Sequence, residues 1–231
     1  MSASTPKKSP GFLLNLVFNI IIPTLVLSKL SEEHLLGPVW ALVAALAFPV
    51  CFGLYELKQS QKVNLLSVLG IVSVLLTGGI SLLQLDPAYI AIKEAAVPGL
   101  IALAVFFSQF TKYPLVKKIL LNDELLDLSK LQQSLQQKNA VALFEQKLRH
   151  CAYLVSATFV LSSVLNYGLA KYLLVSQPGT PAFNEELAQM TALSYPVIAL
   201  PSMLMLMVAI FYLFYQIGKV TGESVENFLR Q

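Results

Sequence analysis

The sequence predicts an all-α integral membrane protein with six transmembrane helices, a cytoplasmic amphipathic helical segment between helices 4 and 5, and both termini in the cytoplasm. Hydrophobic residues make up 56% of the 231 residues and charged residues only 13%. The mean hydropathy is +0.67. Six apolar runs approach the length of about 20 residues that crosses a bilayer. The basic residues are also divided unequally between the loops.

The six runs define the spans of a single membrane domain over residues 1–231. The predicted spans are about 11–30, 36–56, 63–85, 90–111, 151–174 and 194–218. Basic residues precede the first run, as they precede a secretory signal, but the run is too long and lacks a small-residue cleavage pattern. We therefore expect it to be retained as a span. Thr77, Gly78 and Gly79 in the third run are small residues that allow close helix packing.

The distribution of Lys and Arg predicts the orientation, because these residues accumulate on the cytoplasmic side of bacterial inner-membrane proteins. If the six runs cross, thirteen of the sixteen basic residues lie on the side that carries both termini. The opposite side keeps Lys29, Lys93 and Lys171. For a protein of the bacterial inner membrane, this distribution predicts a multi-pass arrangement with cytoplasmic N- and C-termini.

The segment between the fourth and fifth spans, residues 112–150, has the pattern of amphipathic helices. One apolar stripe consists of Leu121, Leu125, Leu128 and Leu135, and a second of Val141, Phe144 and Leu148. Asn122 is a candidate N-cap of the first helix. We expect a pair of helices on the cytoplasmic membrane surface. They either fold back over the bundle or offer a docking surface to a partner.

The outer loop before the sixth span begins with turn-forming residues, Gln177-Pro178-Gly179-Thr180-Pro181. Asn184 resembles a helix N-cap because two glutamates follow it. A short outer helix should therefore precede the sixth span. Pro196 and Pro201 remove backbone donors, so we expect the sixth span to be broken or bent rather than straight.

No motif in the sequence indicates catalysis, a cofactor or a metal. A glycine-rich phosphate loop, His-Glu-x-x-His and Gly-x-Ser-x-Gly are all missing. The cysteines, Cys51 and Cys151, and the histidines, His34 and His150, lack companion ligands. We predict that the protein is not an enzyme and binds no cofactor, although a novel intramembrane activity stays open. The net charge of +3 follows the topology, so we expect no nucleic-acid partner.

Seven residues of the first, fourth and fifth spans form a candidate intramembrane polar site. They are Asn15, Asn19, Pro23, Lys93, Glu94, Pro98 and Asn166. Asn19 lies four residues before Pro23, which leaves the Asn19 carbonyl without its helical partner. Glu94 and Pro98 repeat this spacing three spans later, so the two halves would be inverted. Paired broken helices of this kind mark the binding sites of transporters. The alternative is a chance match that satisfies local kinks.

The two adjacent charges of the fourth span should behave differently. Neighbouring residues of a helix point about 100° apart, so we expect Lys93 and Glu94 to pair poorly with each other. Lys93 is long enough to extend outward to the membrane interface. The shorter Glu94 should face neighbouring helices or water.

Several short elements follow the order found in the bacterial intracellular septation protein A family. They are FNIIIPTLVLSKL at 18–30, Lys93 and Glu94 before Pro98, the basic element Pro114-Leu115-Val116-Lys117-Lys118, and LVSATFVLSSVLNYGL at 154–169, which contains Asn166. The chain resembles a divergent member of this family over most of its length. It departs from the family where an aromatic residue usually accompanies a Lys-Pro step. The resemblance implies an inner-membrane protein of envelope synthesis or division, and it carries over no catalytic residue.

Two classes of function follow. The first is a scaffold or interaction component linked to cell-envelope synthesis or septation, with membrane lipids and other inner-membrane or division proteins as partners. The second is a small transporter or lipid-handling protein with a polar site between proline-broken helices 1 and 4. A homo-oligomer is compatible with either class. Lipid or solute bound between the helices would favour the second.

The charge distribution generates a prediction about topology. A cysteine introduced near Lys29, Pro87 or Thr180 should react with a membrane-impermeant thiol reagent added to intact cells. A cysteine near Lys130 should react only after the membrane is opened. Labelling of position 130 from outside would contradict the six-span arrangement with cytoplasmic ends.

Overall fold

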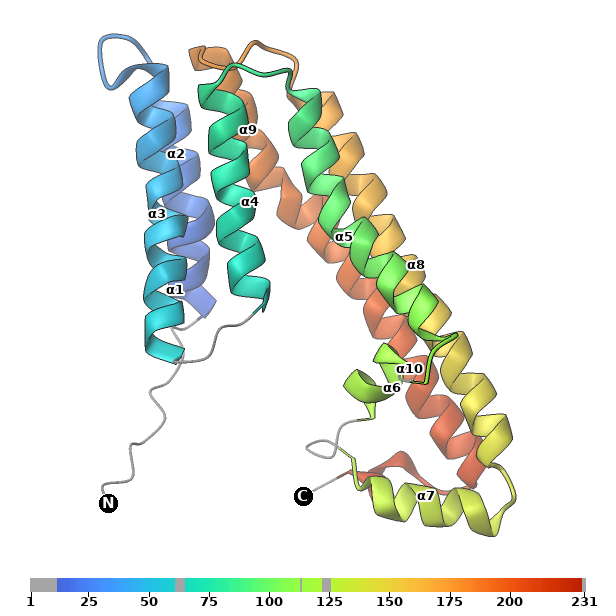
Figure 1. Ribbon diagram of the computed structural model, residues 1–231. Coiled ribbons are helices and arrows are strands. Elements are labelled where there is room, and N and C mark those ends of the chain that lie inside the picture. The colour runs from blue at the N-terminus through green and yellow to red at the C-terminus, as the bar shows by residue number, and fades with distance from the viewer. Residues whose placement is uncertain (1–11, 61–64, 113, 122–125, 230–231) are drawn as a thin grey trace, which may run out of the picture. The chain divides into compact units, whose positions relative to one another are not determined.

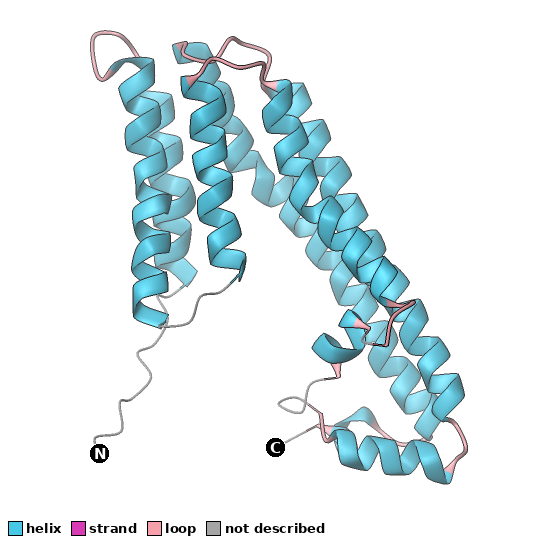
Figure 2. Ribbon diagram, viewed as in Figure 1, coloured by secondary structure: helices cyan, strands magenta, loops and turns pink. Residues whose placement is uncertain are grey.

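The computed structural model describes residues 12–60, 65–112, 114–121 and 126–229 (Figure 1). Within these ranges every regular element is a helix (Figure 2). Five helical stretches of the described chain are long and apolar enough to cross a membrane. They are Leu13–Leu30, Gly37–Lys58, Ala88–Ser108, Val141–Leu173 and Pro181–Thr221. The prediction of an all-α protein with several membrane-spanning helices is confirmed in this coarser form.

The third predicted span, 63–85, corresponds to helix α4, Leu65–Leu82. Its continuous apolar part among the described residues, Val68–Leu82, is shorter than the five stretches above. After its C-terminal end, Gln84 has a positive φ of 53°, and Asp86 accepts a hydrogen bond from the Ala88 amide at 2.7 Å before the next helix. Six crossings therefore remain a prediction.

The chain forms two compact units. Unit 1 comprises Met1–Glu94 and Asn166–Val197, and unit 2 comprises Ala95–Leu165 and Ile198–Gln231. Unit 1 holds α1 (Phe12–Leu16), η1 (Val17–Ile21), α2 (Ile22–Leu30), α3 (Gly37–Ser60), α4 and α9 (Pro181–Ser194). Unit 2 holds α6 (Leu115–Leu120), α7 (Leu128–Gln137), α10 (Leu200–Thr221) and η3 (Val225–Phe228). Helices α5 (Ala88–Ser108), α8 (Val141–Leu173) and η2 (Tyr195–Ala199) contribute residues to both units.

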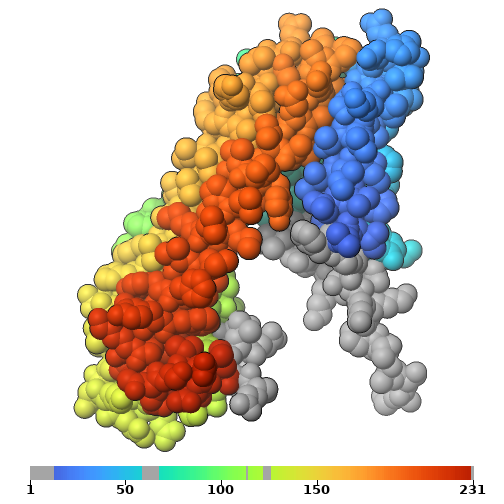
Figure 3. Space-filling model, turned by 180° about the vertical axis from the view of Figure 1, so that it is seen from behind, coloured from blue at the N-terminus to red at the C-terminus, as the bar shows by residue number. Residues whose placement is uncertain are grey.

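In unit 1, α3 and α4 approach each other closely at two glycines. A Cβ atom at Gly53 would lie 3.0 Å from Cγ1 of Ile71, and one at Gly78 would lie 2.9 Å from Cδ1 of Leu46. The two contacts are seven residues apart on each helix and run in opposite directions, as in an antiparallel pair. Helix α2 (dark blue) packs beside α9 (orange) in Figure 3. Glycine thus provides the close packing expected of small residues in membrane helices.

The N-terminal end of α9 differs from the predicted cap. Thr180 is the N-cap and accepts a hydrogen bond from the Phe183 amide at 3.2 Å, with Pro181 in the first turn. Asn184 is fully buried inside the helix, where its amide donates to Ser31 Oγ at 2.9 Å and to the Pro38 carbonyl at 2.7 Å. Thr180 is the N-cap because Pro181, which follows it, suits the first helical position. Asn184 lies inside the helix and connects α9 to Ser31 at the end of α2 and to Pro38 at the start of α3.

The expected short outer helix is continuous with the sixth predicted span. The helix runs from Pro181 to Thr221, and residues Tyr195–Ala199 form a π-helical turn within it. A similar turn, Val17–Ile21, precedes Pro23, and the Ile22 amide donates to the Val17 carbonyl five residues earlier. Proline cannot donate to the carbonyl four residues before it, and a π turn is one way to relieve this without ending the helix.

In unit 2, two serines of α8 bind carbonyl groups of α5. Ser156 donates to the Ala102 carbonyl at 2.9 Å, and Ser163 donates to the Ala95 carbonyl at 2.7 Å. Both serines and both alanines are seven residues apart, so each pair lies on one face of its helix. Hydroxyl groups therefore join the two antiparallel helices within an otherwise apolar contact.

Helix α7 packs against the C-terminal tail. Leu131 and Leu135 are buried with Phe144, Leu148 and Phe228 in one cluster. Lys130 donates to the Asn227 carbonyl at 2.9 Å, and Ser134 donates to Glu223 at 2.6 Å. Lys138 donates to the Thr221 carbonyl at the end of α10. Of the described residues of the predicted leucine stripe, Leu135 is buried in this cluster, and Leu121 and Leu128 are partly buried against it.

Two details of the amphipathic segment differ from the prediction. Asn122 and Leu125 lie outside the described residues, and α7 begins at Leu128 with Asp127 as its N-cap, accepting from the Lys130 amide at 3.0 Å. The stripe of Val141, Phe144 and Leu148 does not form a separate helix. It is the beginning of α8, which continues without interruption into the fifth predicted span.

The packing of α7 generates a prediction about stability. Leu135→Asp should expose the 126–148 region to protease, because a buried leucine contributes roughly 1.5–3 kcal/mol and the aspartate would be desolvated. Gln133→Asp is the matched control, since Gln133 is exposed on the same helix. Limited proteolysis of the detergent-solubilised protein measures the difference. Equal protection of the two variants would contradict burial of the leucine stripe.

Candidate functional site

Four of the seven predicted site residues line one cavity of about 340 Å³ within unit 1. They are Asn19, Pro23, Lys93 and Glu94. The remaining lining is Leu27, Leu46, Pro49, Phe52, Gly53, Glu56, Gly70, Ile71, Ser73, Val74, Thr77, Leu187, Met190 and Thr191. Helices α2, α3, α4, α5 and α9 and the π turn η1 all contribute to the wall. The polar residues of the first and fourth predicted spans therefore meet at one space.

Lys93 is the centre of the polar wall. Its ammonium Nζ donates to the Ser73 carbonyl at 3.1 Å, to Ser73 Oγ at 2.9 Å and to Thr77 Oγ1 at 2.6 Å. A fourth oxygen, Oε1 of Glu94, lies 2.7 Å from Nζ. The Lys93 side chain is 9% exposed and that of Glu94 is 25% exposed. An ammonium group has three protons, so the four oxygen atoms satisfy all of its donors.

This geometry corrects two sequence-based expectations. Lys93 and Glu94 do form an ion pair, and Lys93 extends inward to α4 rather than outward to the interface. Both side chains are flexible enough to converge although their Cβ atoms diverge by about 100° around the helix. Ser73 and Thr77 lie one turn apart on α4 and present their hydroxyl groups to the same ammonium. A complete set of internal acceptors replaces the interfacial water that an outward Lys93 would have needed.

The hydroxyl residues of α4 form a ladder that sequence reasoning missed. Thr77 donates to the Ser73 carbonyl at 3.1 Å, and Ser81 donates to the Thr77 carbonyl at 2.8 Å. Because Thr77 donates to its own helix, its oxygen is free to accept from Lys93. The spacing Ser73, Thr77, Ser81 repeats every four residues and places all three on one helix face. This regular spacing is the signal that could have located the partner of Lys93.

Asn19 reaches the cavity from the π turn. Its side-chain amide donates to Asn15 Oδ1 at 3.0 Å, one turn earlier. Asn15 itself is exposed and does not line the cavity. The π turn lies directly before Pro23, which is buried on the wall. Asn15 therefore belongs to the site only through its hydrogen bond to Asn19.

Pro98 and Asn166 do not line the cavity. Pro98 lies in the part of α5 that belongs to unit 2, where Ser163 binds the neighbouring Ala95 carbonyl. Asn166 is a half-buried residue of α8 within unit 1. These two members of the predicted set are separate from the wall that Asn19 and Glu94 share.

The two proline motifs also differ in backbone geometry. The segment before Pro23 contains the π turn, whereas α5 passes through Pro98 as a regular α-helix. Among the described residues, the π turn recurs at Tyr195–Ala199, directly before Leu200 and Pro201. The spacing Asn19–Pro23 and Glu94–Pro98 is therefore a match in sequence that does not extend to local helix geometry.

The remaining wall is mainly apolar, with one further carboxylate. Phe52 on α3 stacks on Phe18, with ring centroids 5.5 Å apart and planes inclined by 13°. Leu187 and Met190 contribute from α9. Glu56, near the end of α3, also lines the cavity. The sequence analysis singled out neither Phe52 nor Glu56, because α3 reads as an apolar run and its rotation cannot be inferred from that pattern.

Comparison of the chain with known protein families, with curated proteins and with solved structures finds no match. The resemblance to the septation protein A family therefore remains a prediction from short sequence elements.

The ion pair generates a prediction about stability. Lys93→Met should destabilise the protein by up to about 3 kcal/mol, because it leaves a mostly buried carboxylate without its partner. The double variant Lys93→Met/Glu94→Gln removes both charges and should recover most of that loss. Thermal unfolding in detergent measures both effects. If the two variants unfold at the same temperature, the pair does not contribute as a unit.

Proposed function

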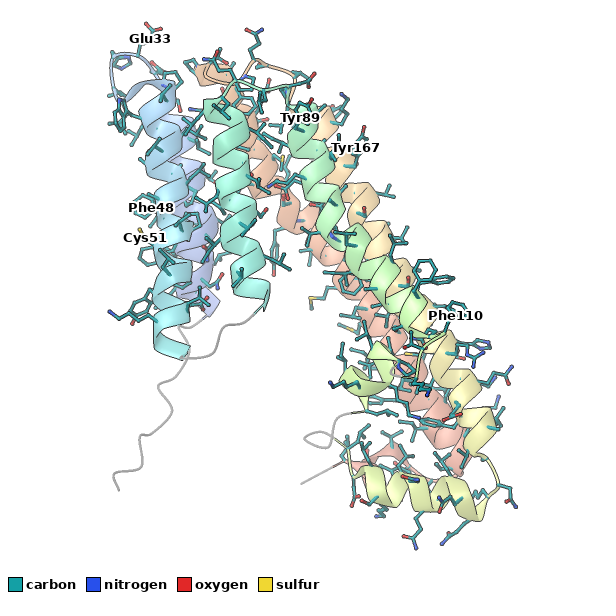
Figure 4. All side chains as sticks on the ribbon, in the orientation of Figure 1. Glu33, Phe48, Cys51, Tyr89, Phe110 and Tyr167 are labelled. Carbon is teal, nitrogen blue, oxygen red and sulfur yellow. The ribbon has the colours of Figure 1, made fainter. Side chains whose placement is uncertain are left out.

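We propose that the protein spans the bacterial inner membrane six times, with both termini in the cytoplasm. The division of the basic residues supports the orientation. Exposed aromatic residues support the crossing of α3, since Trp40 and Tyr55 lie about 22 Å apart at 1.5 Å per residue. Trp and Tyr favour the two membrane interfaces. The exposed Tyr89 and Tyr167 near the outer ends of α5 and α8 fit the same pattern (Figure 4).

Within this membrane arrangement, the protein acts as a small transporter or lipid-handling protein that binds its ligand in the cavity of unit 1. The Lys93–Glu94 pair on the cavity wall carries this proposal. Both residues lie inside α5, an apolar helix long enough to cross a membrane. Charged residues at such positions are costly and commonly mark substrate or ion pathways.

The shape and chemistry of the cavity support a bound molecule rather than a purely structural ion pair. A pair that only joined α5 to α4 would be surrounded by packed side chains. Instead the two charges face a space of about 340 Å³, which is within the range of small-molecule sites. Apolar residues make up most of the wall beside the charged pair, so an amphiphilic molecule matches it best.

The sequence resemblance to the septation protein A family favours a second candidate, a scaffold of cell-envelope synthesis or septation. Unit 2 offers a folded surface for such a role, because α7 and the C-terminal tail form a joint layer around Phe228. Membrane lipids and division proteins are the proposed partners. In that case the cavity of unit 1 would have no ligand, which distinguishes the two candidates.

The two candidates are tested by filling the cavity. A Cβ atom at Gly70 meets open space on the cavity wall, so Gly70→Leu should fill the cavity without a backbone clash. Gly79→Leu is the matched control, because Gly79 lies on the same helix, also meets open space and does not line the cavity. Native mass spectrometry of the protein extracted from its membrane should detect a bound lipid or solute in the wild type and in Gly79→Leu. Gly70→Leu should lose it.

Two outcomes would contradict the transporter or lipid-handling function. One is the same bound molecule on Gly70→Leu and on the wild type, since it would then lie elsewhere. The other is a wild-type protein that carries no bound molecule and gains none when lipids and solutes are added. Either result would leave the scaffold as the better candidate.

A further inference from the structure

We propose that the ligand of the unit 1 cavity is an organic cation, an amphiphile with one ammonium-type charge. This inference rests on the proposed function, because it names the class of molecule that the same cavity binds. The alternatives are an anionic ligand attracted by Lys93, a neutral lipid and a metal ion. The charges and the wall of the cavity distinguish between them.

The lining carries an excess of negative charge. Its charged members are Glu56, Lys93 and Glu94, two carboxylates and one ammonium. The remaining lining residues are uncharged. With all three groups ionised, the cavity has a net charge of one negative unit. A cation entering the cavity would restore neutrality, whereas an anion would add to the imbalance in a medium of low dielectric constant.

Lys93 is not available to an anion. Its three protons already serve four oxygen atoms from Ser73, Thr77 and Glu94, all within 3.1 Å. An anion would have to displace these acceptors, and the carboxylate of Glu94 next to the ammonium would repel it. The positive charge that first suggests an anion site is therefore internally neutralised.

Glu94 remains accessible to a cation. The contact with Lys93 uses Oε1, and a quarter of the Glu94 side chain is still exposed. Glu56 lies on the same wall, beyond Phe52 along α3. A carboxylate has about four lone-pair positions on its two oxygens, so one lysine contact does not saturate it. Both carboxylates can thus attract a positively charged ligand.

The apolar wall distinguishes an organic cation from a metal ion. Hard metal ions need six or more oxygen ligands or retained water, and the described residues contain no group of three or more His, Cys, Asp or Glu that could hold one. Phe52 instead contributes an aromatic ring to the cavity lining, and this ring stacks on that of Phe18. Aromatic rings and carboxylates together bind weakly hydrated ammonium groups. Leu46, Leu187 and Met190 suit the hydrocarbon part of such a molecule.

The probe for this inference is benzyltrimethylammonium, compared with its neutral carbon isostere neopentylbenzene and with the anion phenylmethanesulfonate. The three molecules have similar shapes and differ in charge. Binding to the purified full-length protein in detergent is measured by isothermal titration, with Gly70→Leu as the control for binding in the cavity. Wild-type protein should bind the cation at least about tenfold more tightly than either of the other molecules.

Variants of the two carboxylates and the lysine test the origin of that preference. Glu94→Gln and Glu56→Gln should each weaken cation binding by roughly tenfold and leave neopentylbenzene binding unchanged. Lys93→Met should strengthen cation binding, because it frees the Glu94 carboxylate. The double variant Lys93→Met/Glu94→Gln serves if Lys93→Met does not fold. It keeps the wild-type net charge of one negative unit, from Glu56 alone, whereas the lining of Glu94→Gln is neutral. Its preference for the cation should therefore exceed that of Glu94→Gln.

The results separate this inference from the proposed function. If the cavity binds the neutral or anionic probe as tightly as the cation, and Gly70→Leu abolishes that binding, the ligand class is wrong while the binding function stands. Cation binding that is unchanged in Glu94→Gln and in Glu56→Gln also overturns the inference. If none of the three probes binds and Gly70→Leu retains the native molecule, both proposals fail.

Discussion

An ammonium group enclosed by apolar helices needs oxygen atoms in place of the water it has lost, and the arrangement of unit 1 depends on how Lys93 obtains them. Two come from Ser73, one from Thr77 and one from Glu94. Three of the four lie on α4, so the side chain joins α5 to α4 through hydrogen bonds that hydrocarbon cannot replace. The four oxygen atoms provide an acceptor for each of the three ammonium protons, and an ammonium left without such acceptors would cost more than an ordinary hydrogen bond contributes. The cavity is therefore bordered by a polar contact with a defined geometry.

The existence of the helices followed from composition and hydropathy, because a long apolar run has few alternatives to a buried or membrane-spanning helix. The meeting of Asn19 and Glu94 at one wall was also suggested by sequence, since polar residues within apolar spans tend to face one another. The inward direction of the Lys93 side chain was not suggested by the sequence. It depends on the rotation of α4 about its axis, which turns Ser73 and Thr77 toward α5. Hydropathy averages over all faces of a helix. It therefore carries little information about that rotation, and the contributions of Glu56 and Phe52 were missed for the same reason.

Helix ends and proline positions show a second limit of sequence reasoning. Pro196 and Pro201 suggested a broken or bent sixth span, and the helix continues without a break from Pro181 to Thr221. The π turn at Tyr195–Ala199, which contains Pro196 and precedes Pro201, lets the helix continue. The expectation of a break considered only the backbone N–H that each proline lacks, and it did not include this local widening of the helix. Asn184 was similarly assigned to a cap on composition alone. Its buried contacts are with Ser31 at the end of α2 and Pro38 at the start of α3, residues distant in sequence that only tertiary packing brings to it.

The same hydroxyl chemistry has different consequences in the two units. In unit 2, Ser156 and Ser163 of α8 donate directly to carbonyls of α5, so the two backbones approach closely and no charge is needed. In unit 1, the hydroxyls of α4 instead accept from a lysine that extends from α5. Meanwhile α3 and α4 are kept close by the contacts at Gly53 and Gly78. The close contacts of α4 with α3 and its lysine-bridged contact with α5 both border the cavity, whose lining includes Gly53, Thr77 and Lys93. Glu94 lies on the same wall with a quarter of its side chain exposed, so a ligand in the cavity can reach it.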